Sequence, residues 1–241
     1  MATPQEHYER VLAQHYTWMF GVPFAQMVEG QKALLREAGV NKPGMALDLG
    51  CGSGFQAVAL ADLGAVHVHA VDTSAALLRE LGGHACGRPV TTHEMDLMAF
   101  DLVVGAGADT IVCMGDTLTH LASKSDITVL FSKFANCLRK GGRLVLSWRD
   151  LCQPPVGLDR FIPIRSTDDR TMVCFLEDQG KTVLVHDLVQ IRDKDGWQLQ
   201  KSAYTKLKLS PRWIRSALGQ AGLDPDYEQT TRGMTVLAAT I

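Results

Sequence analysis

The residues with the clearest chemical potential lie at 46–54, where the run ALDLGCGSG joins a hydrophobic segment to an expected helix. Glycines let a ligand approach the backbone closely, and a helix start presents N–H groups without intrahelical partners. Such a loop is typical of nucleotide sites, although a generic tight turn explains a bare glycine loop about as often. The dinucleotide pattern G-x-G-x-x-G/A needs a small residue at position 55, where this chain has Phe55. A nicotinamide cofactor therefore fits the loop poorly.

Two acidic residues follow the next expected strands. Asp72 ends the run VHVHAVD, where an aspartate can accept hydrogen bonds from both hydroxyls of a ribose. Taken alone, Asp72 could equally cap the helix expected from Ser74, but the glycine loop favours the ribose role. Asp96 follows strand 90–95, where it could reach an adenine amino group or serve only as a turn residue.

Alternating strands and helices are expected to position these residues. The hydrophobic periodicity predicts strands at 45–49, 66–71, 90–95, 108–114 and 143–148, and helices at 54–63, 74–82 and 124–140. The helix at 124–140 has the clearest apolar side, with Arg139 and Lys140 in its last turn and Gly141 after it. This alternation predicts an α/β fold, with a mostly parallel sheet and helices on both faces.

The two ends of the chain follow other patterns. Residues 5–20 and 24–38 carry apolar residues at helical spacing, so two helices precede the first strand. Residues 150–209 predict an antiparallel insertion, with strands at 171–177, 183–191 and 197–209 and a hairpin turn at Asp195-Gly196. Ser210-Pro211 begins a helix that stops near Gly222, and a last strand follows at 234–240. Since repeats and low-complexity tracts are absent, we expect one domain over 1–241.

Composition narrows the function classes. The chain has 241 residues with 24 Lys and Arg against 26 Asp and Glu, so it offers no bulk positive field to a nucleic acid. No apolar run approaches membrane-spanning length, and the charged start lacks a signal-peptide pattern. We therefore expect a soluble cytoplasmic protein without a nucleic-acid or membrane partner. The six cysteines lack the paired spacings of zinc or redox sites, and most are expected to be buried and reduced.

Together these features resemble the class I methyltransferases that use S-adenosylmethionine (SAM). Their motif E/D-x-G-x-G-x-G is matched from Asp48 to Gly54, and Asp72, the segment DTIVCMG and the late antiparallel insertion fit as well. The resemblance implies a Rossmann-like fold, SAM as cofactor and S-adenosylhomocysteine as product. The implied cofactor-binding residues are Asp48, Gly50, Cys51, Gly52, Gly54, Asp72, Thr73, Asp96, Leu97, Met114, Gly115 and His120.

Within this superfamily the chain looks similar to the branch of glycine and sarcosine N-methyltransferases. The segment GDTLTHL at 115–121 resembles the branch's G-N-S-F-x-H-L loop, with Asp116 in place of the asparagine that faces the substrate. A carboxylate there would repel an amino-acid carboxylate but suit an amine or an N–H-bearing ring. In SWRD at 147–150, Arg149 takes the place of a substrate-binding arginine, unless it forms a surface ion pair with Asp150 or another neighbour.

The same branch closes its site with an aromatic lid, which implies that residues 1–40 form a helical lid here. The implied substrate-binding residues are Tyr8, Tyr16, Asp116 and Arg149, and the candidates for moving a proton are Tyr8, Asp116 and His120. Trp18, His186 and Tyr204 are further aromatic candidates for which packing is the favoured role. No metal is required.

The expected function is methyl transfer from SAM to a nitrogen of a small soluble molecule, an amine or an N-heterocycle, by direct in-line displacement. The protein would act mainly by holding both reactants together and excluding water. O-methylation of a hydroxyl or carboxyl group is the alternative. An RNA or protein acceptor is disfavoured by the near-neutral charge and the lack of an N-P-P-Y motif, and a non-enzymatic role by the intact loop with Asp72.

Overall fold

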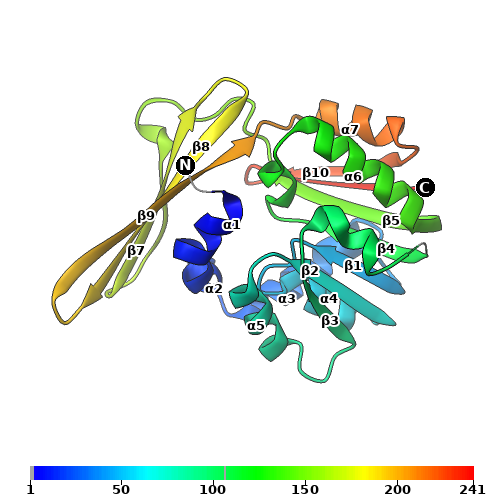
Figure 1. Cartoon of the computed structure of the whole chain (residues 1–241), viewed down its shortest axis with the longest axis horizontal. Helices are drawn as coiled ribbons and strands as arrows, with labels where there is room; N and C mark the ends of the chain where they lie inside the picture. The colour runs from blue at the N-terminus through cyan, green and yellow to red at the C-terminus, as the bar shows by residue number, and fades with distance from the viewer. Residues whose placement is uncertain (1–2, 106) are drawn as a thin grey trace.

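The computed structural model describes residues 3–105 and 107–241, which form two β-sheets, their covering helices and a helical N-terminal segment (Figure 1). Residues 1 and 2 of the expected lid lie outside the described residues. Within those two ranges, no helix combines the length and the apolar character needed to cross a membrane.

The larger sheet has seven strands in the order β10-β11-β5-β4-β1-β2-β3. The neighbouring strands β3, β2, β1, β4 and β5 run parallel. Strands β11 and β10 extend the β5 edge of the sheet and pair antiparallel. Their bounds are β1 Met45–Leu49, β2 His67–Asp72, β3 Val90–Glu94, β4 Ala108–Cys113, β5 Leu138–Arg149, β10 Asp224–Thr231 and β11 Met234–Thr240. The predicted α/β fold with a mostly parallel sheet is confirmed.

Helices cover both faces of this sheet (Figure 1). On one face α3, α4 and α5 bury Leu35, Leu60 and Leu81, and on the other α6 and α7 bury Phe134 and Leu218. The bounds are α3 Phe24–Glu37, α4 Phe55–Asp62, α5 Ala75–His84, α6 Lys124–Cys137 and α7 Pro211–Gln220. Because both faces are covered, the parallel strands are continuous hydrophobic runs.

The smaller sheet is antiparallel, in the order β6-β7-β8-β9, and projects from the body of the molecule (Figure 1). Its strands are β6 Phe161–Ser166, β7 Arg170–Asp178, β8 Thr182–Asp193 and β9 Gly196–Leu207. It has a small core of its own, which includes Leu176, Val183 and Tyr204. The three strands predicted for this region are confirmed, and the β8–β9 turn lies at 194–195, one residue before the predicted pair.

The N-terminal segment is helical from Pro4 to Met19, as predicted, but it is not one helix. It consists of α1 Pro4–His7, the π-helical η1 Tyr8–Leu12, the 3₁₀-helical η2 Ala13–His15 and α2 Tyr16–Met19. Val11 and Leu12 pack against Met172 and Val189 of the smaller sheet. The segment thus changes helical pitch twice between Tyr8 and Tyr16.

Other differences from the sequence prediction lie at element ends and at sheet edges. The helix predicted at 124–140 ends at Cys137, because Leu138 already pairs with Ala108 in the larger sheet, so Arg139 and Lys140 belong to β5. The edge strands β6 and β10 were not predicted. Neither were the short 3₁₀ turns η3 Leu97–Leu102, η4 Thr117–His120 and η5 Gly157–Arg160.

Candidate active site

The glycine loop lies where β1 ends, at the point where the strand order of the larger sheet reverses. From β1 the chain proceeds outward to β2 and β3, and then returns to place β4 on the other side of β1. A crevice at the carboxyl ends of the strands is expected at such a point, and ligands of open α/β sheets bind there. The loops that follow β1, β2, β3 and β4 all contribute residues to one cavity.

The backbone of the loop is fixed by β2. Gly50 and Cys51 donate their backbone N–H groups to the carbonyl of Val71, and Gly52 donates its N–H to Asp72 Oδ2 at 2.8 Å. Gly52 has a φ of +53°, and a Cβ on it would lie 3.2 Å from the Tyr16 ring of the lid. The absence of a side chain at this position therefore leaves the main chain open to a ligand beneath the lid.

Asp72 binds backbone on both carboxylate oxygens. Its Oδ2 accepts from Gly52, and its Oδ1 accepts from the backbone N–H of Ser74 at 2.9 Å. The helix cap is Ser74, whose hydroxyl accepts from Leu77 N, so the structure assigns the capping role to Ser74 and not to Asp72. Burial raises the pKa of Asp72. Each oxygen keeps a second lone pair, which leaves Asp72 able to accept from two ligand hydroxyls.

Asp48, Cys51 and Gly54 of the predicted cofactor set belong to the segment 46–54 but do not line the cavity. Asp48 is buried, its Oδ2 lacks a hydrogen-bond partner in the described structure, and burial, followed by the charge of Asp72, raises its pKa to about 8. Burial likewise raises the pKa of the Cys51 thiol, which makes it a poor nucleophile. These residues shape the loop from inside.

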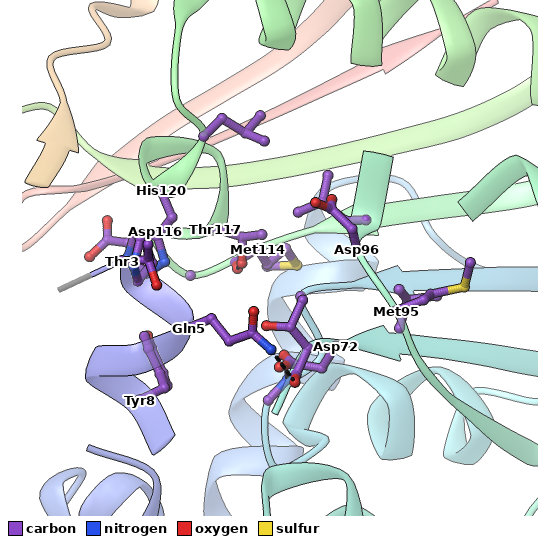
Figure 2. Close-up of a pocket in the computed structure, with 18 of the residues that line it drawn as sticks. Thr3, Gln5, Tyr8, Asp72, Met95, Asp96, Met114, Asp116, Thr117 and His120 are labelled. Atoms are coloured by element: carbon purple, nitrogen blue, oxygen red, sulfur yellow. Dashed lines mark hydrogen bonds between the residues drawn. The ribbon is translucent and has the colours of Figure 1, made fainter. Parts of the chain in front are cut away.

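The cavity has a volume of about 300 Å³, at the lower end of the range for small-molecule sites. In Figure 2, Asp72 and Asp96 lie toward one side, Asp116 and His120 lie toward the other, and Gln5 and Tyr8 enter from the lid. Of the predicted residues it is lined by Tyr8, Tyr16, Gly50, Gly52, Asp72, Thr73, Asp96, Leu97, Met114, Gly115, Asp116 and His120. Its other lining residues are Thr3, Pro4, Gln5, Val71, Met95, Thr117 and Leu121.

Asp96 caps a short helix and also lines the cavity. Its Oδ1 accepts from the backbone N–H of Met98 at 2.8 Å and caps the short helix η3, while the residue also lines the cavity beside Leu97. Met95 and Met114 add flexible apolar side chains nearby. An apolar slot with an acid at its rim suits a flat heterocycle that carries an amino group.

Asp116 is held by two cations. Its Oδ1 accepts from the backbone N–H of Arg149 at 2.9 Å, and its Oδ2 accepts from Arg149 Nη1 and Lys206 Nζ, both at 2.7 Å. Burial alone would raise the pKa of this carboxyl, but the two cations outweigh burial and hold it far below the ordinary value. Asp116 is therefore a poor proton acceptor, contrary to the role predicted for it. Arg149 pairs with Asp116 rather than with Asp150, and does not line the cavity itself.

Aromatic rings surround the same end of the cavity. The His120 ring lies 5.8 Å from the Tyr8 ring and 5.4 Å from the Tyr204 ring, between centroids. Burial, assisted by the charge of Lys206, lowers the pKa of His120 to about 3, so the imidazole is neutral at pH 7. Its Nε2 is buried without a hydrogen-bond partner in the described structure. Burial raises the pKa of Tyr8 and Tyr16, which keeps both as phenols.

Sequence reasoning missed Lys206 and the buried pair of His7 with Asp187. Lys206 lies in β9, and nothing in its surrounding sequence links it to Asp116. Tyr204 packs against His7 and His120 and does not line the cavity, in line with the packing role favoured for it. His186 also lies outside the cavity lining, and its Nε2 is 2.5 Å from Glu177 Oε2. Across residues 3–105 and 107–241, no group of three or more His, Cys, Asp or Glu side chains is arranged to hold a metal ion.

Comparison with known proteins identifies the fold of this site. Residues 46–142, which contain the glycine loop and strands β1 to β4, match the Methyltransferase domain family. The chain is 29% identical to a glycine/sarcosine N-methyltransferase of Halorhodospira halochloris over 106 residues, which is 43% of this chain and 39% of that protein. The match thus spans about two fifths of the relative's length.

Solved structures match along almost the whole chain. The CcbJ methyltransferase of Streptomyces caelestis has a TM-score of 0.80 and 20% identity, with 98% of each chain covered. The SAM-bound amino pentose methyltransferase CalS10 of Micromonospora echinaspora has a TM-score of 0.72 and 20% identity, with 94% of this chain and 95% of that chain covered. At these identities the structures establish the fold. The predicted Rossmann-like methyltransferase fold is confirmed.

Proposed function

We propose that this chain, which has the fold and the domain match of a class I methyltransferase, transfers a methyl group from SAM to a nitrogen of a small molecule. The proposal is carried by the hydrogen bond from Gly52 N to Asp72 Oδ2 at the mouth of the crevice. This contact places bare backbone and an acid with free lone pairs on one wall of the cavity. Such a pairing suits the close approach and the ribose hydroxyls of an adenosyl group.

Several residues of the chain would hold the cofactor. Asp72 would accept from the ribose hydroxyls, and Asp96 would accept from the adenine amino group, with Leu97 and Met114 against the faces of the base. Bound SAM supplies a methyl group that its cationic sulfur already activates. The lid residues Gln5 and Tyr8 would help to exclude water from it, because both line the cavity from the N-terminal segment.

Nitrogen is favoured as the accepting atom by the polar end of the cavity. Asp116 lines this end as a carboxylate, and a carboxylate accepts hydrogen bonds from N–H groups. The partly matching relative is named as an N-methyltransferase, which agrees with this choice. Because neither Asp116 nor His120 takes a proton readily, the chain would act through positioning and exclusion of water.

Two measurements test the proposal. Calorimetry should show that wild-type protein binds SAM and S-adenosylhomocysteine, and Asp72→Ala should weaken SAM binding more than tenfold, about 1.4 kcal/mol. Asp62→Ala is the matched control, because Asp62 pairs with Arg88 on the surface away from the cavity. Near-normal SAM affinity in Asp72→Ala would show that Asp72 does not bind the cofactor.

The second measurement identifies the accepting atom. Radiolabelled SAM is supplied with a panel of small amines, N-heterocycles, phenols and carboxylic acids, and the products are separated. We expect label on nitrogen compounds. Label confined to phenols or carboxylates would show that the protein is an O-methyltransferase. Absence of SAM binding would contradict the proposed methyltransferase activity as a whole.

A further inference from the structure

Asp116 joins three parts of the fold that are far apart in the sequence. It follows β4, Arg149 ends β5 of the larger sheet, and Lys206 lies in β9 of the smaller sheet. The side chains of Asp116 and Lys206 are 9% and 10% exposed, whereas that of Arg149 is 55% exposed. Lys206 therefore forms the buried and well-defined side of this cluster, and solvent screens the Arg149 contact more strongly.

The hydrogen bonds leave Asp116 one free acceptor position. An ionised carboxylate has about four lone-pair sites, two on each oxygen. Lys206 and Arg149 Nη1 occupy both sites of Oδ2, and the backbone N–H of Arg149 occupies one site of Oδ1. Since Asp116 also lines the cavity, the remaining site on Oδ1 is available to a hydrogen-bond donor of a bound molecule.

The charges around Asp116 disfavour a cationic acceptor. One carboxylate faces two cations, so the cluster carries a net positive charge that opposes an ammonium ion. The other titratable groups around it are His120 of η4, Tyr8 and Tyr16 of the lid, Tyr204 of β9, Cys174 of β7 and the buried Asp187 of β8, which pairs with His7. Burial keeps the imidazole of His120, the three phenols and the Cys174 thiol neutral at pH 7, because it lowers the pKa of the imidazole and raises that of each phenol and of the thiol.

We infer that Lys206 is a positioning residue, which fixes the Asp116 carboxylate as a hydrogen-bond acceptor for an uncharged N–H-bearing methyl acceptor. The acceptor part of this inference rests on the proposed function, whereas the coupling of Lys206 to Asp116 does not. In the transfer, the nitrogen lone pair forms the new N–C bond while the S–C electron pair stays on sulfur. The nitrogen keeps its protons during this step, and the methylated ammonium loses one to solvent afterwards.

The first experiment measures the coupling without any ligand. Protein labelled with ¹³C at aspartate carboxyls is titrated by NMR, and Asp116 is identified by the resonance that Asp116→Asn removes. In wild type this resonance should stay at its ionised position down to pH 4. In Lys206→Met, which keeps the apolar stem but lacks the ammonium, it should titrate with a midpoint above pH 4. Lys206→Arg should restore the wild-type behaviour.

Lys208→Met is the matched control, because Lys208 lies two residues further along and pairs with Asp178 instead. It should leave the Asp116 resonance unchanged. If Lys206→Met does not fold, Lys206→Gln takes its place. An Asp116 resonance that stays ionised to pH 4 without Lys206, or one that titrates above pH 4 in wild type, overturns the coupling.

The second experiment tests the charge state of the acceptor. It uses two amines methylated in the screen above whose own pKa values differ by at least one unit. The midpoint of kcat/KM against pH should follow the pKa of each amine, because each binds uncharged. A common midpoint for both amines would mean that a group of the protein takes the proton, and it overturns the inference. If no compound is methylated, the proposed function and the acceptor part fail, while the NMR titration still decides the coupling.

Discussion

Asp48 shows how burial changes the chemistry of a single residue. The residue is 1% exposed, and burial, followed by the charge of Asp72, raises its pKa to about 8 from the ordinary aspartate value of 3.8. Between these two values the folded protein binds more protons than the unfolded chain. Protonation of Asp48 therefore contributes its whole stabilisation of the folded state below about pH 4, and this stabilisation is lost as the pH rises toward 8.

We predict that the cofactor-free wild type loses stability from pH 6 to pH 9, and that Asp48→Asn loses less. Asparagine keeps an oxygen that accepts a hydrogen bond but has no charge to bury. The difference over this window is at most about 3 kcal/mol, which corresponds to a difference in melting temperature of at most roughly 6–12 °C for a chain of this size. Thermal melts at both pH values measure it, and parallel melting curves for the two proteins would contradict the pKa assigned to Asp48.

Single residues near the loop were predictable from local sequence, whereas their distant partners were not. Gly52 and Asp72 were identified because glycine runs and strand-end acids are visible in short segments. Asp116 was identified from the resemblance of GDTLTHL to a family loop, but its charge state depends on Lys206, which is 90 positions away in the chain. A lone acid at position 116 suggests a base, and only its buried partners show that it does not readily take a proton.

At the scale of elements, the turn from β1 to α4 depends on contact with α5. Gly54 has a φ of +97°, and a Cβ there would lie 2.1 Å from Leu81 Cδ1. Leu81 is fully buried, so it cannot swing into solvent. Gly64, after α4, has a similar φ of +89° with nothing within 4 Å of such a Cβ. A comparison of Gly54 with Gly64 therefore separates the cost of a positive φ from the cost of overpacking.

We predict that Gly54→Ala destabilises the protein more than Gly64→Ala. Both substitutions force a side chain into a positive φ at a cost of about 1–2 kcal/mol, and Gly54→Ala adds overpacking of about 1–3 kcal/mol against α5. Urea denaturation of the two variants and the wild type gives both free energies of unfolding. Equal losses would show that α5 moves aside freely.

Element prediction found the parallel strands and missed two exposed edge strands. The strands at 45–49 and 234–240 have the predicted bounds, because their buried hydrophobic runs end at clear turns. The edge strands β6 and β10 are largely exposed, and β6 contains Pro163, so neither has the apolar alternation that reveals a strand. The end of α6 was misplaced because sheet pairing of Leu138, a non-local contact, stops the helix.

For the whole molecule, the N-terminal lid connects the two sheets across the cavity. On one side His7 Nε2 lies 2.9 Å from Asp187 Oδ2 of β8, and both side chains are buried. On the other side, the Ser74 hydroxyl at the start of α5 donates to Glu9 Oε1 at 2.7 Å. We infer that the lid stays closed over the cavity through both sets of contacts, which would couple the smaller sheet to the cofactor end of the site.

We predict that His7→Ala opens the lid and weakens SAM binding. The variant leaves the buried Asp187 carboxylate without its partner, which costs about 3–5 kcal/mol when the pair is charged, and part of this penalty is relieved if the lid detaches. Trypsin should then cut after the exposed Arg10 faster than in wild type. SAM should slow this cleavage, because the cavity it fills is lined by Gln5 and Tyr8 of the lid.

His67→Ala is the matched control, since His67 lies on β2 in contact with Thr91 and His69, away from the lid. It should leave both cleavage and SAM affinity at wild-type values. If His7→Ala resists trypsin as wild type does but binds SAM weakly, the pair acts on the cavity without holding the lid closed. If cleavage accelerates while SAM affinity is unchanged, the lid does not contribute to cofactor binding. Either result would contradict the coupling of the two sheets through the lid, because that coupling requires both quantities to change together.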